Sequence, residues 1–302
     1  MLHITQTALS LGCIYSLVAL ALFLSYRVLD IADLTTDGCF VLGMAVSVSL
    51  AAQGSPFMGL ILAILAGGCA GFVTALLQTR FGVPSIIAGI ITNTGLYTVN
   101  LMAMGWSSNV SLIKQETIFT IFRATGIGGS WYAIILTAVI AALCMALMRW
   151  FLRTRIGLSI RATGDNPGMV SASSINPKFM ITVGLTFANC FTALSGAIAG
   201  QLQKSADINA GTGIVVIGLA TLIIGETVIN GRRTISRNIL ACLIGNIIYR
   251  FIYAIVLQTR VIPIEGLKLM TAFIVAAAIA APHVRRSLAV KRRERRETRQ
   301  DA

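Results

Sequence analysis

Long apolar runs, separated by short polar breaks, follow one another along most of the chain. Each run is continuous, and most approach the roughly 20 residues that an α-helix needs to cross a hydrocarbon core about 30 Å thick. Continuous runs favour helices over barrel strands, because a helix satisfies its own backbone hydrogen bonds in lipid. The pattern predicts about nine membrane spans, at 7–26, 37–52, 56–78, 83–104, 131–151, 180–203, 214–230, 238–257 and 266–282.

The composition agrees with a membrane protein. The 302 residues are 56% hydrophobic and 12% charged, and the mean hydropathy is +0.83. These values lie far from the averages of soluble globular proteins. The sequence therefore predicts an all-α fold, a polytopic transmembrane helical bundle. We expect the first apolar run to remain as a span, because it lacks the basic leading region and the cleavage site of a signal peptide.

Lys and Arg residues are distributed unevenly among the predicted loops. If the loop at 153–177 is cytoplasmic, about 18 cations fall on that face and about 5 on the other. This distribution predicts an N-terminus outside and a C-terminus inside. The formal net charge of +13 reflects the same bias, so we expect contact with anionic membrane lipids and no nucleic-acid partner.

Residues that carry catalysis or bind metals form no cluster in the sequence. The six cysteines lie singly within predicted spans, and the two histidines, His3 and His283, fall at opposite ends of the chain. A Gly-Lys pair, which a phosphate-binding loop needs, does not occur. The sequence predicts a protein that is not an enzyme, holds no metal or cofactor, and depends on a partner for any ATP hydrolysis.

A polar, Gly- and Ser-rich segment at 153–177 separates two long apolar runs. Its pattern predicts a short helix along the membrane face, with exposed backbone on either side. Asp165, Asn166 and Pro167 form a favourable start for a helix at 165–174, with Asp165 as the cap. Small residues such as Ala172 would let this helix lie close to another protein. The segment is thus a predicted docking element for a cytoplasmic partner, the alternative being an ordinary linker.

Polar side chains inside the predicted spans are candidates for a translocation path. Asn93 and Tyr97 lie four residues apart on one face of the fourth span, and Asn100 lies one turn further. This stripe would present amide and phenol groups to a solute. The alternative is hydrogen bonding between neighbouring helices.

Two charged residues in the second half of the chain need partners. Arg250 lies well inside a predicted span, where an unpaired guanidinium costs about 3 kcal/mol or more. It could pair with a solute carboxylate on the path or form a fixed ion pair with an acid such as Asp207. Glu226 lies close in sequence to Arg232 and Arg233, which predicts an ion pair at the headgroups.

Two short Ala-Asp elements echo each other, at 32–38 and 206–211, and each opens a predicted span. By the predicted topology, the first lies inside and the second outside, as two repeats of opposite orientation would require. Chance similarity in an apolar chain is the alternative. We expect a first transmembrane repeat at 1–151, a coupling loop and second repeat at 152–282, and a basic cytoplasmic tail at 283–302.

Several strings resemble the permease subunits of bacterial ABC importers for branched-chain amino acids and ribose-type sugars. The resemblance covers most of the chain and rests on GLSIRATGDN at 157–166 and SGAIAG at 195–200. A narrower similarity is to the subgroup for tryptophan- or tyrosine-like substrates, through DLTTDG at 33–38, YTVNL at 97–101 and GLA with IIGE at 218–226. Cys39 stands where that subgroup usually has Ser.

The resemblance implies a permease subunit in a bacterial inner membrane that imports a small solute, such as an aromatic or branched-chain amino acid. It implies a second permease copy, identical or related, two ABC ATPase subunits and an extracytoplasmic solute-binding protein. The implied coupling residues are Gly157, Arg161, Ala162, Gly164, Asp165, Asn166, Pro167 and Ala172. The alternative is a stand-alone secondary transporter or channel for a small polar solute. Against it, the spans lack the several buried acids of a proton relay.

Overall fold

The computed structural model describes residues 2–113, 115–124, 126, 129–229, 234–259, 272–273 and 276. The first half contains α1 (Leu2–Leu22), the π-helical turn η1 (Phe23–Val28), α2 (Thr36–Ala52), α3 (Pro56–Thr79), α4 (Ser85–Ala103), β1 (Asn109–Ser111), α5 (Ile118–Ala124), η2 (Gly129–Trp131) and α6 (Tyr132–Phe151). The second half contains α7 (Arg155–Asp165), α8 (Pro167–Ala172), α9 (Pro177–Gln203), β2 (Ser205–Asp207), α10 (Ile214–Ile229) and α11 (Ile235–Thr259).

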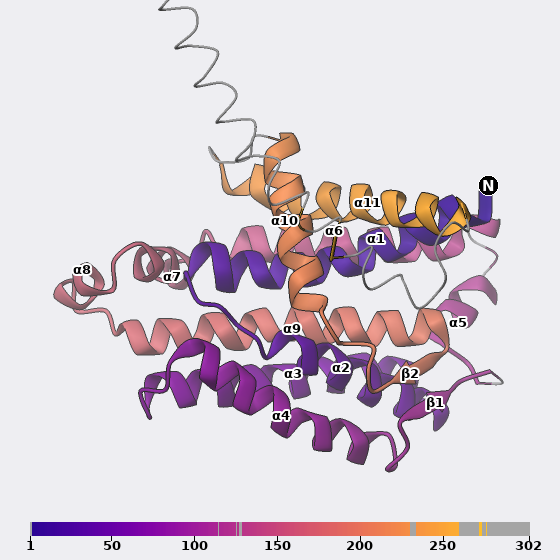
Figure 1. Cartoon of the computed structure of the whole chain (residues 1–302), viewed down its shortest axis with the longest axis horizontal. Helices are drawn as coiled ribbons and strands as arrows, with labels where there is room; N and C mark the ends of the chain where they lie inside the picture. Colours follow the sequence, from indigo (N-terminus) through magenta and orange to yellow (C-terminus); the bar gives the residue numbers. More distant parts are fainter. Residues whose placement is uncertain are drawn as a thin grey trace, which may run out of the picture.

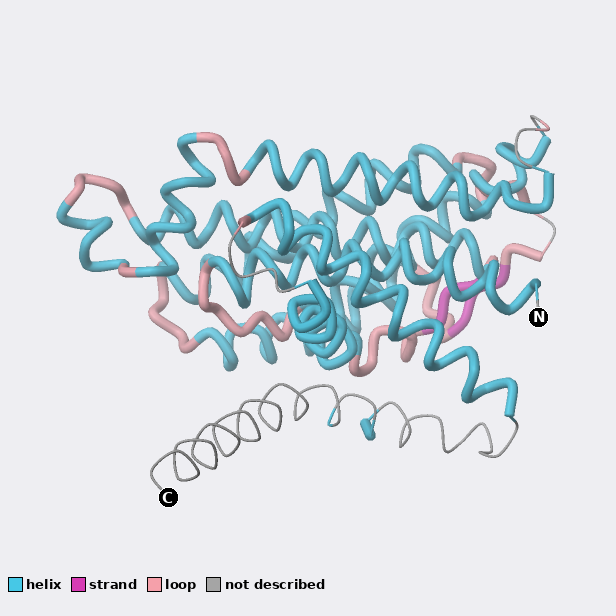
Figure 2. The backbone as a smooth tube through the Cα atoms, turned by 90° about the horizontal axis from the view of Figure 1, so that it is seen from above, coloured by secondary structure: helices cyan, strands magenta, loops and turns pink. Residues whose placement is uncertain are grey.

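The long helices run along one common axis and form two layers with α9 between them (Figure 1). Helices α1, α6 and α11 form one layer, and α2, α3 and α4 form the other. Helix α10 crosses from one layer to the other, and it is therefore seen nearly end-on in Figure 2. Helices α7 and α8 project from one end of the bundle, whereas the N-terminus, α5 and both strands lie at the opposite end.

The central helix α9 packs closely against α2 because both helices carry glycine at their contact. A Cβ at Gly43 would overlap the backbone of Ala193, and a Cβ at Gly196 would overlap the carbonyl of Phe40. Small residues let helix backbones approach where lipid supplies no hydrophobic driving force between helices. This contact also fixes the position of α2, whose middle lies beside the middle of α9.

Helix α2 begins about halfway along the bundle instead of at one end. The chain leaves η1, runs without helix through 29–35, and enters α2 at Thr36. The first turn of α2 lies beside the second half of α4: a Cβ at Gly38 would meet the side chains of Asn93 and Leu96, and the carbonyl of Gly38 accepts a hydrogen bond from the Asn100 amide at 3.1 Å. Helix α2, with 17 residues, is therefore a short element that starts near the middle of the bundle.

The two strands join segments that follow α4 and α9. They pair antiparallel, with Asn109 opposite Asp207 and Ser111 opposite Ser205. After β2, residues 208–213 lead back along α2 into the bundle, where α10 begins. A Cβ at Gly211 would overlap the carbonyl of Asp37, so only glycine fits this close approach.

The helical bundle predicted from the sequence is confirmed, and eight predicted spans correspond to helices with closely similar ends. Six helices are long and apolar enough to cross a membrane within the described residues. Helices α2 and α10 agree with the predicted spans at 37–52 and 214–230 within one residue, but with 17 and 16 residues they are shorter than the six and begin inside the bundle. The predicted span at 266–282 and the tail at 283–302 lie almost wholly outside the described residues.

Candidate functional site

The first turns of the two short helices, α2 and α10, meet near the middle of the bundle through one carboxylate. Asp37, in the first turn of α2, accepts hydrogen bonds from the backbone N–H groups of Gly213 at 3.0 Å and Val215 at 2.8 Å. The first four N–H groups of a helix have no partner within it, and a carboxylate is favourable near that positive end. Asp37 thus serves the N-termini of both α2 and α10.

The chain reaches these two N-termini through segments of similar construction from opposite ends. At one end, Asp33 Oδ1 accepts from the backbone N–H of Thr35 at 2.9 Å. At the other, Asp207 Oδ1 accepts from the N–H of Asn209 at 2.7 Å. Both are Asx turns, in which an Asp side chain bonds the backbone two residues on. The two Ala-Asp elements therefore share a local structure, while the proposed division into repeats stays a prediction.

A polar cavity of about 350 Å³ opens beside this junction, between α2, α4 and the loop from β2 to α10. It brings together all three residues of the predicted stripe on α4, namely Asn93, Tyr97 and Asn100. The remaining lining residues are Asp37, Gly38, Val41, Thr94, Ile208, Asn209, Gly211 and Thr212. A volume of this size suits a small solute.

Asn100 and Tyr97 occupy different positions in the cavity wall. Asn100 is 1% exposed, and its amide Nδ2 donates to the carbonyl of Gly38, so one half of the amide ties α4 to α2. Its Oδ1 has no hydrogen-bond partner within the described structure. Tyr97, by contrast, is 52% exposed. The stripe therefore combines a helix-to-helix hydrogen bond with an accessible aromatic side chain, and its place on a translocation path stays a prediction.

A second polar cluster holds the non-helical segment before α2. Asp33 is 3% exposed, and its Oδ2 accepts from Asn189 Nδ2 of α9 at 2.7 Å. The hydroxyls of Thr35 and Thr74 lie 2.8 Å apart, which links the same segment to α3. Buried polar groups need such partners because water cannot reach them. These bonds keep an extended backbone in place within the bundle and so set where α2 begins.

Arg250 lies apart from the cavity, on α11 in the other layer of the bundle (Figure 1). Its guanidinium stacks over the ring of Tyr15 at 3.8 Å from the centroid, and it lies 6.0 Å from the ring centre of Tyr253. Asp207 is engaged with Asn209 and Asn109 instead. The predicted ion pair between Arg250 and Asp207 is therefore wrong, because aromatic faces supply the compensation that a buried cation needs.

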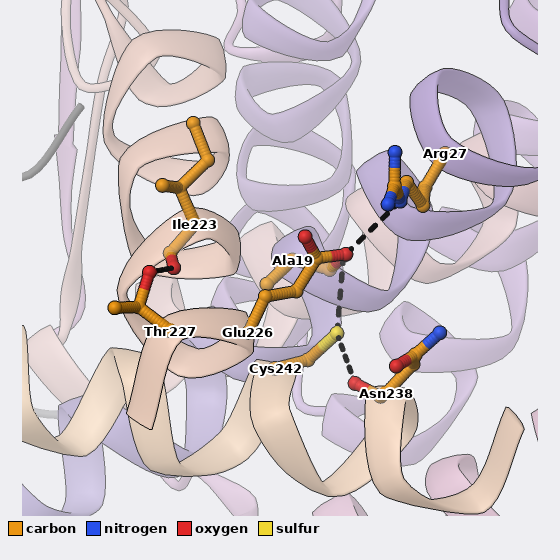
Figure 3. A network of polar contacts seen from close by, with 7 residues as sticks. All are labelled: Ala19, Arg27, Ile223, Glu226, Thr227, Asn238 and Cys242. Atoms are coloured by element: carbon orange, nitrogen blue, oxygen red, sulfur yellow. Dashed lines mark hydrogen bonds and ion pairs between the residues drawn. The ribbon is translucent and has the colours of Figure 1, made fainter. Parts of the chain in front are cut away.

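Glu226 forms an ion pair with Arg27, a partner that the sequence analysis did not consider. Figure 3 shows Glu226, near the end of α10, facing Arg27 in η1, with Arg27 Nε 3.1 Å from Glu226 Oε1. Arg232 and Arg233 lie outside the described residues. Beside this pair, the Cys242 thiol donates to the carbonyls of Asn238 at 3.3 Å and Ala19 at 3.7 Å. The pair thus connects η1, which continues α1, with the end of α10, on the side of the bundle that carries α7.

The predicted docking segment forms two helices that extend beyond the bundle. Helix α7 begins after Thr154, whose hydroxyl accepts from the N–H of Gly157 at 3.2 Å. Helix α8 follows after a single residue, with Asn166 Oδ1 accepting from the N–H of Met169 at 3.1 Å and Pro167 as its first residue. The cap is therefore Asn166, whereas the sequence predicted Asp165, which ends α7.

The other predicted coupling residues fall into two groups. Gly157 and Gly164 pack inward, since a Cβ at either would overlap a backbone carbonyl of Phe151 or Val28. Arg161 lines a small cavity with Arg27 and Asp165, while Ala162 is half-buried on α7 and Ala172 is exposed at the end of α8. The first group positions α7 against the bundle, and the exposed residues of α8 are free for contact with another protein.

The most central residue of the site, Asp37, was not among the predicted path residues. Its partners Gly213 and Val215 lie 176 and 178 positions away, so no local spacing could indicate them. An acid at the start of an apolar run was the available signal, because such residues are costly in a membrane and are kept for a reason. Asn209 and Thr212 gave no comparable signal, since they belong to a polar loop.

Comparisons with known proteins agree on one family. Residues 4–280 match the family described as the permease component of the branched-chain amino acid transport system. A tyrosine transport system permease protein of Clostridioides difficile is 32% identical over 276 residues, which cover 91% of this chain and 90% of that protein. An uncharacterized protein of Rickettsia prowazekii is 31% identical over 93% of this chain and 98% of its own length.

A more distant relative is the guanosine ABC transporter permease of Bacillus subtilis. It is 26% identical over 250 residues, which cover 77% of this chain and 69% of that protein. No solved structure matches the chain.

Proposed function

The chain belongs to the family of branched-chain amino acid transport permeases and is a permease subunit of an ABC importer, and on this premise we propose that its polar cavity forms part of the translocation path. The observation that carries this proposal is the meeting of α2 and α10 at Asp37. In many transporters, helices that are interrupted within the membrane form the solute site near its midplane, and α2 and α10 both begin inside the bundle.

The cavity also requires a protein neighbour. Tyr97 and Thr94 are exposed on the outer side of α4 at mid-depth, where polar groups facing lipid would be costly. A second permease copy, identical or related, that packs against this side of α4 would close the cavity and turn it into a channel between two subunits. The path would then have one wall from each copy.

We place ATP hydrolysis in two separate ABC ATPase subunits that bind at α7 and α8. Met169 is 68% exposed on α8, which gives this short helix an apolar side chain for a partner groove. Cations gather at the same end of the bundle, including Arg80, Arg149 and Arg153. By the positive-inside rule this end is cytoplasmic, which puts the N-terminus outside.

The solute is an amino acid, delivered by an extracytoplasmic binding protein that docks near β1, β2 and α5. The support is the tyrosine transport named for the Clostridioides difficile relative, which aligns with nine-tenths of the chain. The branched-chain amino acid transport in the family's description points to the same class. The membrane would be a bacterial inner membrane.

Uptake by the reconstituted complex tests the function. The chain would be co-expressed with a candidate ATPase and binding protein, purified and placed in proteoliposomes supplied with ATP. We expect uptake of labelled L-tyrosine or L-leucine, a strong loss for Tyr97→Ala, and little change for Val99→Ala, which is exposed on α4 outside the cavity. Uptake of guanosine alone would contradict the amino acid, and normal uptake by Tyr97→Ala would contradict the path.

A further inference from the structure

The backbone of the loop that lines the cavity beside Asp37 offers few hydrogen-bond donors, so the donors in the wall are the side chains of Asn93, Tyr97, Asn209 and Thr212. In the loop that lines it, the N–H of Ile208 bonds the Ser108 carbonyl at 3.0 Å and the N–H of Thr212 bonds the Asn209 carbonyl at 3.1 Å. The N–H of Asn209 bonds the side chain of Asp207, as described above. Most of the loop's backbone donors are thus already paired inside the protein.

Acceptors, in contrast, remain available. Each carboxylate oxygen of Asp37 receives one backbone N–H, and a carboxylate can accept about four hydrogen bonds in total. Asn100 adds an amide oxygen that has no partner and is buried within the wall. Its orientation is fixed, because turning the amide around would bring its oxygen against the carbonyl of Gly38. The cavity therefore carries unmatched acceptors on α2 and α4.

The charges around the cavity disfavour capture of a carboxylate. Asp37 already occupies the positive N-termini of α2 and α10, so the partial charges of these helix ends are not free to attract a solute carboxylate. Among the described lining residues there is no Lys, Arg or His. Arg250 lies on α11, a helix of the other layer. A solute carboxylate would find no free cation here.

We infer that this cavity recognises the ammonium group of the solute, with Asp37 and Asn100 as the residues that determine this specificity. The inference rests on the proposed translocation path and names the part of the solute that the path contacts. An ammonium group brings three donors and a positive charge, which match the free acceptors. The exposed ring of Tyr97 beside them offers a face that also attracts cations.

The inference can be tested with two thiol reagents of similar size and opposite charge. Thr94, which lines the cavity, would be replaced by Cys in a Cys69→Ser background, because Cys69 is the exposed thiol of the described chain. The purified complex would then react with 2-aminoethyl methanethiosulfonate, an ammonium compound, or with its 2-sulfonatoethyl counterpart, a sulfonate. Mass spectrometry of the intact chain gives both rates.

Thr98→Cys is the matched control, since Thr98 is exposed one turn further along α4 and does not line the cavity. We expect the ratio of ammonium to sulfonate rates at position 94 to exceed that at position 98 by about three- to tenfold, as one unit charge nearby gives in a partly aqueous site. Asp37→Asn should lower the ratio of ammonium to sulfonate rates at position 94 to that at position 98. Asn100→Leu is a second variant, and it should also lower the ratio at position 94.

Equal ratios at the two positions, or a faster sulfonate reaction at position 94, would overturn the inference. Failure of the path gives a different result. Uptake measured before and after complete modification of Cys at position 94 should fall if the cavity is on the path. Unchanged uptake together with a high ammonium ratio would reject the path while leaving the charge preference in place.

Discussion

The carboxylate of Asp37 accepts a hydrogen bond from the backbone N–H of Val215 at 2.8 Å, across 178 positions of sequence. This bond joins the start of α2 to the start of α10, two short helices that the chain enters from opposite ends of the bundle. A second bond, from the N–H of Gly213, strengthens the same junction. Because helix N-termini repel each other when they meet, the shared carboxylate is what lets them approach.

Removal of the Asp37 carboxylate should weaken the fold measurably. Asp37→Ala leaves two backbone N–H groups of α10 without acceptors, which we expect to lower the free energy of unfolding by about 1–2 kcal/mol. Asp37→Asn keeps one acceptor oxygen and should cost less. Reversible unfolding in mixed micelles would measure both. Equal stability of Asp37→Ala and the unmodified chain would mean that the junction contributes nothing to the fold.

One added methyl group at the contact between α2 and α9 should also lower the free energy of unfolding. Gly43→Ala places a Cβ against the backbone of Ala193, which has no room to move, and should cost about 1–3 kcal/mol in the free energy of unfolding. Gly95→Ala is the matched control, because nothing lies within 4 Å of a Cβ at Gly95 on the exposed side of α4. The control should be neutral or gain up to about 1 kcal/mol from helix propensity. Equal thermal unfolding of the two variants would contradict the close packing.

Hydropathy along the chain predicts where helices lie but not how deep they start. The predicted spans at 56–78 and 131–151 agree with α3 and α6 almost residue for residue, because apolar length and helix length follow the same bilayer. Helices α2 and α10 are as apolar as the full spans, so hydropathy could not reveal that they begin at mid-depth. The Asp33 cluster, the Asp37 junction and the glycine contact between α2 and α9, all made by distant residues, set that depth.

The candidate site was predictable in the same partial way. Asn93, Tyr97 and Asn100 share a helix face by local spacing, and the cavity does bring them together. Arg250 was grouped with them because it is an intramembrane cation. Its separation from the cavity depends on how α11 packs in the bundle, which the sequence does not indicate. Its partner, the ring of Tyr15, is not a residue that charge matching would select.

Arg27 and Glu226 should show a small but measurable coupling energy. Their side chains are 45% and 16% exposed, so water screens much of the attraction. A double-mutant cycle with Arg27→Gln and Glu226→Gln should give about 0.5–1 kcal/mol, lower at high salt. Because this pair joins η1 to the end of α10, coupling that is zero at low salt would show that the two helix ends are held by packing alone.

The stacking of Arg250 on Tyr15 should matter for the fold and not for the solute. Tyr15→Leu removes the aromatic face and should cost about 1–2 kcal/mol, whereas Tyr15→Phe keeps it and should be tolerated. Arg250→Gln should lower the yield of folded protein, with uptake per purified complex close to that of the unmodified chain. A normal yield combined with lost uptake would instead return Arg250 to the translocation path.

A carboxylate at the end of α8 should separate ATP hydrolysis from transport. Ala172 is exposed there, and Ala172→Glu would bring an unpaired charge into the proposed contact with the ATPase. Such burial costs about 2 kcal/mol or more, which weakens docking roughly 30-fold. Ala124→Glu makes the same change on exposed α5 at the opposite end and should retain the ATPase. Co-purification and uptake per ATP hydrolysed measure the effect. Ala124→Glu is the control for co-purification alone, because α5 lies near the proposed dock of the binding protein. If Ala172→Glu retained the ATPase as Ala124→Glu does and kept the uptake per ATP of the unmodified chain, the coupling contact would have to lie elsewhere than α8.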